Sequence, residues 1–206
     1  MLLVKFMKIQ EYDEVHLNQV PGMLLRFSYV DLKAMTNNFS DELGARGFGS
    51  IYKGTLKNGE KIAVKFLGGL GLAKKSFLAE VETTGKIHRV NLVRLIGFSA
   101  ETSYRFLVYD YMQNGSLDKW IFCTNKEDTL GLLLRKEIIL DDAKGLAYLH
   151  EECKQKIVHL DIKPQNTLLD ENFSAKISDF GLSKLIDKDQ SQVATTLRGT
   201  LWLQNG

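Results

Sequence analysis

The stretch Ile157-Val158-His159-Leu160-Asp161-Ile162-Lys163-Pro164-Gln165-Asn166 decides the fold of this chain, together with Asp179-Phe180-Gly181, which begins thirteen positions after the Asn. The two segments bring two carboxylates, a lysine and an asparagine amide close together in the sequence. Phosphoryl transfer requires one carboxylate to orient a hydroxyl, a cation for the phosphate, and an Asn and an Asp to hold Mg²⁺. The pattern therefore favours phosphoryl-transfer chemistry.

These segments resemble the catalytic loop and the metal-binding motif of eukaryotic protein kinases. Their surroundings, VHLDIKPQNTLLD at positions 158–170, are similar to plant receptor-like serine/threonine kinases, most closely to the lectin-type (S-receptor-like) group. The resemblance implies that Asp161 orients the substrate hydroxyl and accepts its proton, and that Lys163 stabilises the transferring phosphate. It also implies that Asn166 and Asp179 hold Mg²⁺.

Composition places the chain among ordinary soluble globular proteins. It has 206 residues, of which 44% are hydrophobic and 25% charged, enough for one large domain or two small lobes. A formal net charge of +2 gives no reason to expect nucleic acid as a partner. Cys123 and Cys153 are far apart, which fits a reducing compartment.

The sequence contains no apolar run of about 18 residues, so we expect no membrane span and a cytoplasmic chain. The related full-length receptors are implied to sit at the plasma membrane, with the kinase domain in the cytosol.

The order of local patterns predicts an α+β fold. Ser28 followed three residues later by Asp31 is close to a capping box and predicts a short helix to about Asn37. Asn58-Gly59 predicts a hairpin inside a strand-like region that runs from 43 to 67. We expect further helices at 73–87, 116–122 and 132–152, and further strands at 92–97, 105–110, 167–169 and 175–177.

This order is the two-lobed layout of protein kinases. We expect residues 1–26 to form a flexible lead-in, and 27–112 to form the N-lobe with its preceding short helix, through the hinge. The N-lobe should contain a complete antiparallel sheet and one main helix. Residues 113–206 would form only the first part of the helical C-lobe and end in the activation segment. The basis is that 201–206 do not resemble the G-Y-x-A-P-E of the family.

Gly44-Ala45-Arg46-Gly47-Phe48-Gly49 resembles the glycine-rich loop over the ATP phosphates. Glycines let backbone N–H groups approach phosphate oxygens without interference from a Cβ. The resemblance implies that Gly44, Gly47 and Gly49 bind ATP, although Arg46 replaces the middle glycine of the family pattern. Taken alone, a glycine-rich segment of this kind is more often a plain turn.

Ile62-Ala63-Val64-Lys65 is similar to the V-A-I-K strand of the family. Glu80, in Phe77-Leu78-Ala79-Glu80-Val81, matches its F-x-x-E-V segment and would pair with Lys65. The alternative is a solvated lysine at a strand end and a surface glutamate on a helix.

Leu107-Val108-Tyr109-Asp110-Tyr111-Met112 resembles the hinge that binds adenine through backbone groups. The match implies that Tyr109 is the gatekeeper, that Asp110 lies in the hinge and that Met112 carries the hinge amide. The adenine ring would be sandwiched by Ile51, Ala63 and Leu168. The hinge segment is also compatible with a buried edge strand, and Ile51, Ala63 and Leu168 are also compatible with a plain core.

Two further positions depart from the family pattern. Leu160 stands where many kinases have an Arg, so the chain resembles the non-RD subset. Asp142 falls within an apolar helix face formed by Ile138, Ile139, Ala143, Leu146 and Leu149. A buried, unpaired carboxylate is costly, so we expect this helix to be less stable than its relatives. By resemblance, His159 is structural and packs beside Phe180.

The first interpretation is an ATP- and Mg²⁺-dependent kinase that transfers phosphate to Ser/Thr hydroxyls of a protein substrate. The second is a truncated, impaired module that holds nucleotide or docks on a full-length receptor kinase. The third is a fragment that does not fold alone, because helix 132–152 has a wide apolar face. Candidate phosphate acceptors in the activation segment are Ser191, Thr195, Thr196 and Thr200.

Overall fold

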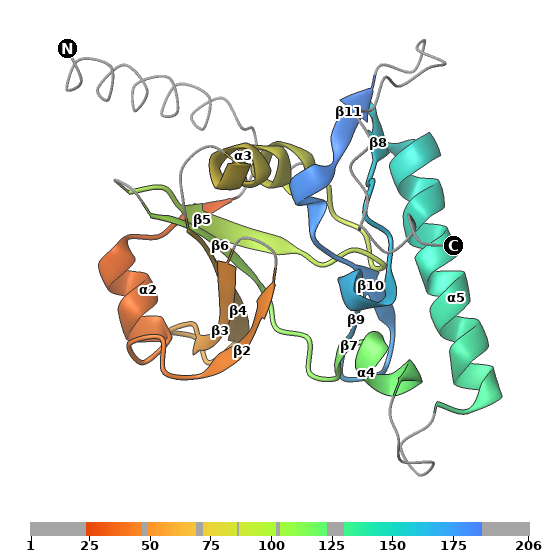
Figure 1. Cartoon of the computed structure of the whole chain (residues 1–206), viewed down its shortest axis with the longest axis horizontal. Coiled ribbons are helices and arrows are strands. Elements are labelled where there is room, and N and C mark those ends of the chain that lie inside the picture. Colours follow the sequence, from red (N-terminus) through yellow and green to blue (C-terminus); the bar gives the residue numbers. More distant parts are fainter. Residues whose placement is uncertain are drawn as a thin grey trace, which may run out of the picture. The chain divides into compact units, whose positions relative to one another are not determined.

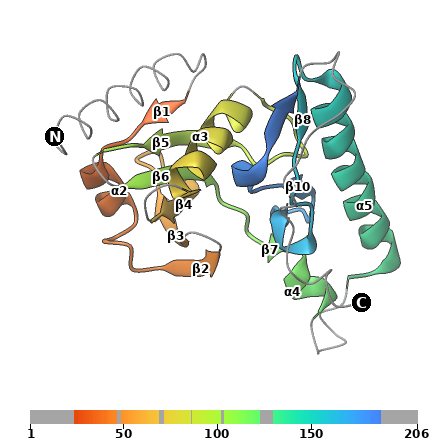
Figure 2. The same ribbon diagram turned by 45° about the horizontal axis from the view of Figure 1, so that its top comes forward.

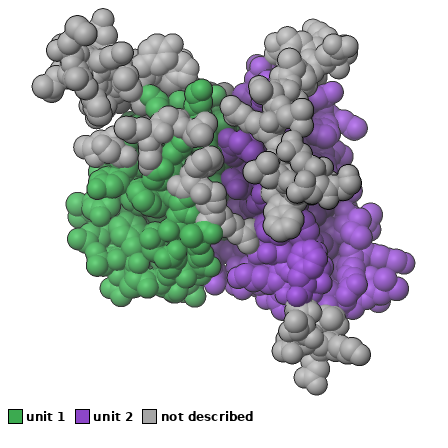
Figure 3. Space-filling view, in the orientation of Figure 1, with its two compact units in different colours: residues 1–86, 95–110 green, residues 87–94, 111–206 purple. Residues whose placement is uncertain are grey.

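The computed structural model of the chain describes residues 24–46, 49–68, 72–85, 87–101, 104–122 and 130–186. Two compact units are present: a first unit of residues up to 85 with Leu95–Asp110, and a second unit of 87–94 with residues from 111 on (Figure 3). The expected boundary at 112 differs from this division mainly in the segment 87–94. The expectations for Gly47, Cys123 and the four activation-segment hydroxyls lie outside the described residues.

The first unit is built on a six-stranded sheet with the strand order β1-β5-β6-β4-β3-β2 (Figure 1). Its strands are β1 (Leu25–Arg26), β2 (Glu42–Arg46), β3 (Gly49–Thr55), β4 (Lys61–Leu67), β5 (Leu95–Ser99) and β6 (Arg105–Asp110). All neighbours are antiparallel except β1, which runs parallel to β5. The predicted N-lobe sheet is confirmed, with an additional parallel edge strand that the sequence pattern does not predict.

Local signals in the first unit act as expected. Helix α2 (Tyr29–Met35) begins after Ser28, whose Oγ accepts a hydrogen bond from the Asp31 amide at 3.0 Å. The Ser28 amide donates in return to Asp31 Oδ2 at 3.3 Å, so the predicted capping box is complete. The β3–β4 hairpin turns at Gly59, which has φ +91°, as the Asn58-Gly59 pair predicts.

The side chains of β4 alternate between the two faces of the sheet, as the period of a strand requires. Leu67 packs in a core cluster with Phe77 and Val81 of helix α3 (Leu72–Thr84). Ile62 and Val64 join a second cluster with Leu32 of α2. Helix α3 therefore covers one face of the sheet and α2 the other (Figures 1 and 2).

The second unit contains helix α4 (Asp118–Ile121), helix α5 (Leu132–Ala147) and a π-helical turn, η2 (Tyr148–Glu152). It has a three-stranded sheet with the order β10-β9-β7 and a two-stranded one of β11 and β8. These strands are β7 (Gly115–Ser116), β8 (Lys156–Val158), β9 (Thr167–Leu169), β10 (Ala175–Ile177) and β11 (Lys184–Ile186). Strands β9 and β10 have their predicted bounds, whereas the predicted long helix is α5 continued by a π turn.

Segment 87–94 connects to the second unit through its backbone. The Val93 amide donates to Ile177 O at 3.0 Å, and the Ile177 amide donates to Asn91 O at 2.9 Å. The Arg89 guanidinium also binds the Glu152 carboxylate at 2.8 Å. The prediction that a strand begins at residue 92 is wrong, because these hydrogen bonds go to β10 and β5 begins at Leu95.

Helix α5 has a buried face and an exposed one. Ile138 is 2% exposed, whereas Ile139, which the apolar pattern places on the same face, is 66% exposed. The expectation that Asp142 is unpaired is wrong, because its Oδ2 accepts a hydrogen bond from Thr167 Oγ1 at 3.0 Å. Its Oδ1 is buried without a hydrogen-bond partner in the part of the chain that the structure describes. Other exposed leucines of α5 are Leu132, Leu133 and Leu140.

Among the described residues, no helix combines the length and the apolar character needed to cross a membrane.

Candidate functional site

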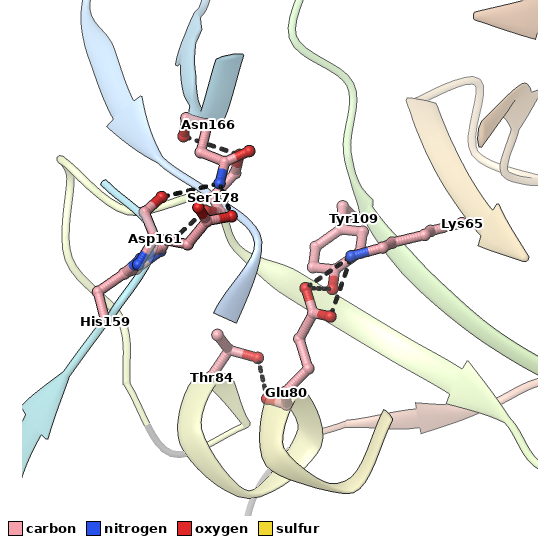
Figure 4. Close-up of polar contacts among 8 residues, drawn as sticks. All are labelled: Lys65, Glu80, Thr84, Tyr109, His159, Asp161, Asn166 and Ser178. Carbon is pink, nitrogen blue, oxygen red and sulfur yellow. Dashed lines mark hydrogen bonds and ion pairs between the residues drawn. The ribbon is translucent and has the colours of Figure 1, made fainter. Parts of the chain in front are cut away.

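The Lys65–Glu80 pair of the first unit is present as an ion pair. Lys65 Nζ lies 3.1 Å from Glu80 Oε2 and 3.5 Å from Oε1 (Figure 4). Glu80 is 0% exposed and Lys65 only 9%. The alternative of two solvated surface charges is therefore wrong. A buried pair of this kind is retained only when both charges are compensated by hydrogen bonds.

Tyr109 is the third member of this group. Its hydroxyl donates a hydrogen bond to Glu80 Oε1, so both oxygens of the buried carboxylate have a partner (Figure 4). The register of the sheet explains the contact: Tyr109 of β6 pairs with Ala63 of β4, two residues from Lys65 on the same face. The sequence marks Tyr109 only as the gatekeeper beside the hinge, since strand register is needed to see the contact with α3.

The second unit carries a separate polar group around Asp161. Lys163 Nζ lies 2.7 Å from Asp161 Oδ2. Asn166 Nδ2 donates to the same oxygen at 2.9 Å (Figure 4). Asn166 Nδ2 also donates to the Asp161 carbonyl at 2.9 Å. The structure therefore brings together three of the four residues that the catalytic-loop and metal-binding motifs single out.

Asn166 also connects this group to the segment that carries Asp179. Its carbonyl accepts hydrogen bonds from the Ser178 amide at 2.8 Å and from Ser178 Oγ at 2.9 Å (Figure 4). Asp179 itself has φ +67°, in the left-handed region that side-chain-bearing residues rarely occupy. Leu160 is in the same region, with φ +65°. Such backbone conformations persist where the surroundings fix them, and they cluster at functional sites.

His159 holds the backbone of the group and does not belong to its charges. The Asp161 amide donates to His159 Nδ1 at 3.2 Å, so Nε2 carries the proton and donates to Ser178 O at 2.9 Å. Burial lowers the pKa of His159 below its ordinary value, against the opposing effect of the Ser178 carbonyl. Its ring lies 4.8 Å from that of Phe180, edge to face, which confirms the expected packing.

Two glycines of the predicted phosphate loop are described. Gly44 has φ +153°, a conformation that favours glycine, and a Cβ at this position would meet no atom within 4 Å, so space is available there. At Gly49 a Cβ would lie 1.6 Å from the Phe66 carbonyl oxygen, so strand packing by itself already requires a glycine here. The family resemblance assigns the same phosphate-binding role to both glycines, whereas their structural surroundings differ.

The remaining predicted nucleotide-binding residues lie in both units. Ile51, Ala63 and Asp110 are half-buried strand residues of the first unit. Met112 is 9% exposed and belongs to the second unit, as does the half-buried Leu168 of β9.

The chemistry of the expected metal ligands fits Mg²⁺, which prefers oxygen donors and few protein ligands. Both side-chain hydrogen bonds of Asn166 use its nitrogen, so among the described residues no donor occupies its amide oxygen. Within the same described ranges, no cluster of three or more His, Cys, Asp or Glu side chains forms an alternative metal site.

The buried Lys–Glu pair and the Asp-Lys-Asn group, in a two-unit α+β chain, are the residues expected of a phosphotransferase of the kinase class. The family model of the protein kinase domain matches residues 38–204, and the chain belongs to that family.

The relatives of the chain include receptor-like kinases and other plant kinases. The chain is 55% identical to the G-type lectin S-receptor-like serine/threonine-protein kinase SD2-5 of Arabidopsis thaliana, over 89% of this chain and 22% of that protein. It is 54% identical to the G-type lectin S-receptor-like serine/threonine-protein kinase At2g19130 of the same plant, over 87% and 22%. The wheat (Triticum aestivum) rust resistance kinase Lr10 is 46% identical, over 85% and 28%. The resemblance to receptor-like kinases is confirmed, and the chain spans under a third of each of these relatives.

Proposed function

We propose that this chain binds Mg-ATP and transfers the γ-phosphate to serine or threonine hydroxyls of a protein substrate. The observation that carries the proposal is the Asp161 carboxylate, held by Lys163 at 2.7 Å and by Asn166 at 2.9 Å. A carboxylate fixed in this way can orient a hydroxyl and accept its proton, while the neighbouring ammonium stabilises the phosphate.

The metal site would consist of Asn166 and Asp179. The hydrogen bonds from Ser178 to the Asn166 carbonyl hold the two chain segments together, which supports this assignment. Bound Mg²⁺ would neutralise phosphate charge, and the two side chains would hold the ion.

Nucleotide binding would use further residues of both units. Lys65, oriented by Glu80, would bind phosphate oxygens, and Gly44 and Gly49 would belong to the loop above them. The backbone of the hinge, at Asp110 and Met112, would bind adenine, whose ring would lie between Ile51, Ala63 and Leu168. Tyr109 would stand at the back of this site as the gatekeeper.

The names of the relatives support the substrate class. Several are serine/threonine-protein kinases of the receptor-like type, which favours a Ser/Thr protein substrate and a kinase domain that faces the cytosol. A full-length receptor kinase is a candidate partner on the same grounds.

The experiment compares the parent chain with Asp179→Asn and Asp161→Asn. We expect Mg-ATP to raise the melting temperature of the parent, since a ligand at about 100 times its Kd stabilises by roughly 2.7 kcal/mol. Asp179→Asn should lose this shift, whereas Asp161→Asn should keep it and lose transfer of labelled γ-phosphate to a generic basic protein.

Equal loss of nucleotide binding in both variants would contradict the assigned roles. A melting shift without any transfer in the parent would support the nucleotide-holding module instead of the enzyme.

A further inference from the structure

Residues 24–37, here called the N-terminal strap, precede the matched kinase domain and nevertheless pack on it. The strap comprises β1, the capped start of α2 and α2 itself. Figure 2 shows β1 along the β5 edge of the sheet, in the neighbourhood of α3. The family match begins at residue 38, so the domain pattern itself does not account for this packing.

The strap is attached to β5 by backbone contacts. Leu25 pairs with Gly97 and Arg26 with Phe98 in parallel register. The Phe27 amide donates to Phe98 O at 3.0 Å. Two residues further on, the Tyr29 amide donates to Glu101 Oε2 at 2.9 Å. These contacts fix the strap along the edge strand.

A chain of ring contacts leads from the strap to α3. The Arg26 guanidinium lies 5.5 Å from the centre of the Phe98 ring. The Phe98 ring in turn meets the edge of Phe77 of α3, with 6.0 Å between centroids. Phe77 is 1% exposed and stands three residues before Glu80, on the same side of the helix. Leu24 packs against the cluster that contains Phe77.

The strap is also held on the opposite face of the sheet. Leu32 is 0% exposed and packs with Ile62, Val64 and Phe106. The Tyr29 ring lies 5.9 Å from that of Phe106. Because one continuous segment contacts both faces around the β5 edge, its position is coupled to the sheet and to the helix packed on it.

We propose that the N-terminal strap positions helix α3, and thereby the Glu80 carboxylate that Lys65 contacts. Detachment of β1 from β5 loosens α3 and weakens the Lys65–Glu80 pair without changing any atom of that pair. The strap is a positioning segment for the phosphate-binding lysine, and this role rests on the proposed function of Lys65.

Gly97 offers a selective test. A Cβ at this position would lie 2.1 Å from Leu25 O and 2.8 Å from Phe27 Cε2, and the three nearest atoms all belong to the strap. Gly97→Ala therefore displaces the strap first. Gly131→Ala is the matched control, because a Cβ there would meet no atom within 4 Å.

Hydrogen exchange of the whole chain, read by mass spectrometry without nucleotide, measures the mobility of α3 directly. We expect exchange in α3 to rise about fivefold or more in Gly97→Ala, within the usual range of coupling between sites. Exchange in the second unit should stay unchanged, and Gly131→Ala should leave α3 unchanged. The Mg-ATP affinity of Gly97→Ala should fall, with a larger effect on the KM for ATP than on kcat.

Faster exchange confined to the strap and β5, or no change anywhere, overturns the proposal. If Gly97→Ala does not fold, Arg26→Ala at the exposed strand β1 tests the same path, and unchanged α3 exchange in that variant overturns it. Absence of nucleotide binding in the parent contradicts the proposed function alone, since exchange of α3 is measured without nucleotide.

Discussion

The polar group of the first unit is sealed from water, whereas that of the second unit is open to it. The side chains of Lys65 and Glu80 are 11% and 0% exposed, and those of Lys163 and Asp161 are 34% and 16% exposed. Solvent weakens a partly exposed ion pair and also compensates either charge when its partner is lost. The comparison indicates that loss of a partner should destabilise the fold more in the first group than in the second.

The largest expected effect is at Glu80. Glu80→Ala leaves the Lys65 charge buried without its carboxylate, which costs about 3–5 kcal/mol. Asp161→Ala removes a partly exposed ion pair, worth less than about 1 kcal/mol, together with the hydrogen bond from Asn166, and should cost less than Glu80→Ala. Urea denaturation monitored by circular dichroism compares the two. The double variant Lys65→Met, Glu80→Leu should recover much of the lost stability, because this pair then leaves no buried charge. Equal costs for Glu80→Ala and Asp161→Ala would contradict the distinction between the two groups.

Tyr109→Phe should have the next largest effect. It removes the hydroxyl that donates to Glu80 and keeps the ring, so the buried carboxylate loses one charge-assisted hydrogen bond. Such bonds contribute about 1.5–3 kcal/mol. Tyr52→Phe serves as the control, since the Tyr52 hydroxyl makes no hydrogen bond within the described residues. If both variants have the same urea midpoint, the Tyr109 hydroxyl does not support Glu80.

Asp142→Asn should give the smallest effect and the opposite sign. Burial raises the pKa of Asp142, against the hydrogen bond from Thr167. A raised pKa stabilises the fold below the ordinary value of 3.8, and that stability is lost as pH rises through the raised value. At pH 7 the charged carboxylate is therefore unfavourable in the folded state. The neutral amide should be more stable, by less than about 1 kcal/mol, because the carboxylate is only partly buried and solvent screens its charge.

The pH dependence checks this assignment. The advantage of Asp142→Asn over the parent should disappear as the pH falls below 3.8, where the parent carboxyl is neutral in both the folded and the unfolded chain. The lowered pKa of His159 acts in the other direction, because its stabilising effect is lost as pH falls below 6.5. That contribution is common to both proteins and cancels in their difference. A constant advantage across this range would show that charge is not the reason.

Much of the fold follows from local signals, and the failures are all non-local. The Ser28–Asp31 capping box and the Asn58-Gly59 turn are confirmed because each is decided within a few residues. Strand β1 has two residues and no alternation to detect, so only its pairing with β5 defines it. Leu92 looks like the start of a strand, but the backbone around it bonds to β10.

The site shows the same division. The resemblance to the kinase family predicts that Lys65 contacts Glu80, and the catalytic-loop motif groups Asp161 with Asn166. The sequence does not predict that Tyr109 bonds to Glu80, which depends on register in the sheet. It also places Asp142 on an apolar face without a partner, because Thr167 is distant in sequence. Contacts between separate elements that no family motif marks, such as these two, cannot be predicted from a single sequence.

The strand order of the first unit has a consequence for how the protein folds during its synthesis. Strand β6 lies between β4 and β5 in the sheet, yet it is the last of the six strands in the chain. During synthesis the edge of β4 that will receive β6 stays unpaired until residue 110 has emerged, and α3 has no completed surface to pack on. Non-local pairing of this kind slows folding and exposes strand edges to aggregation. Expression at low temperature or with chaperones should therefore improve the soluble yield.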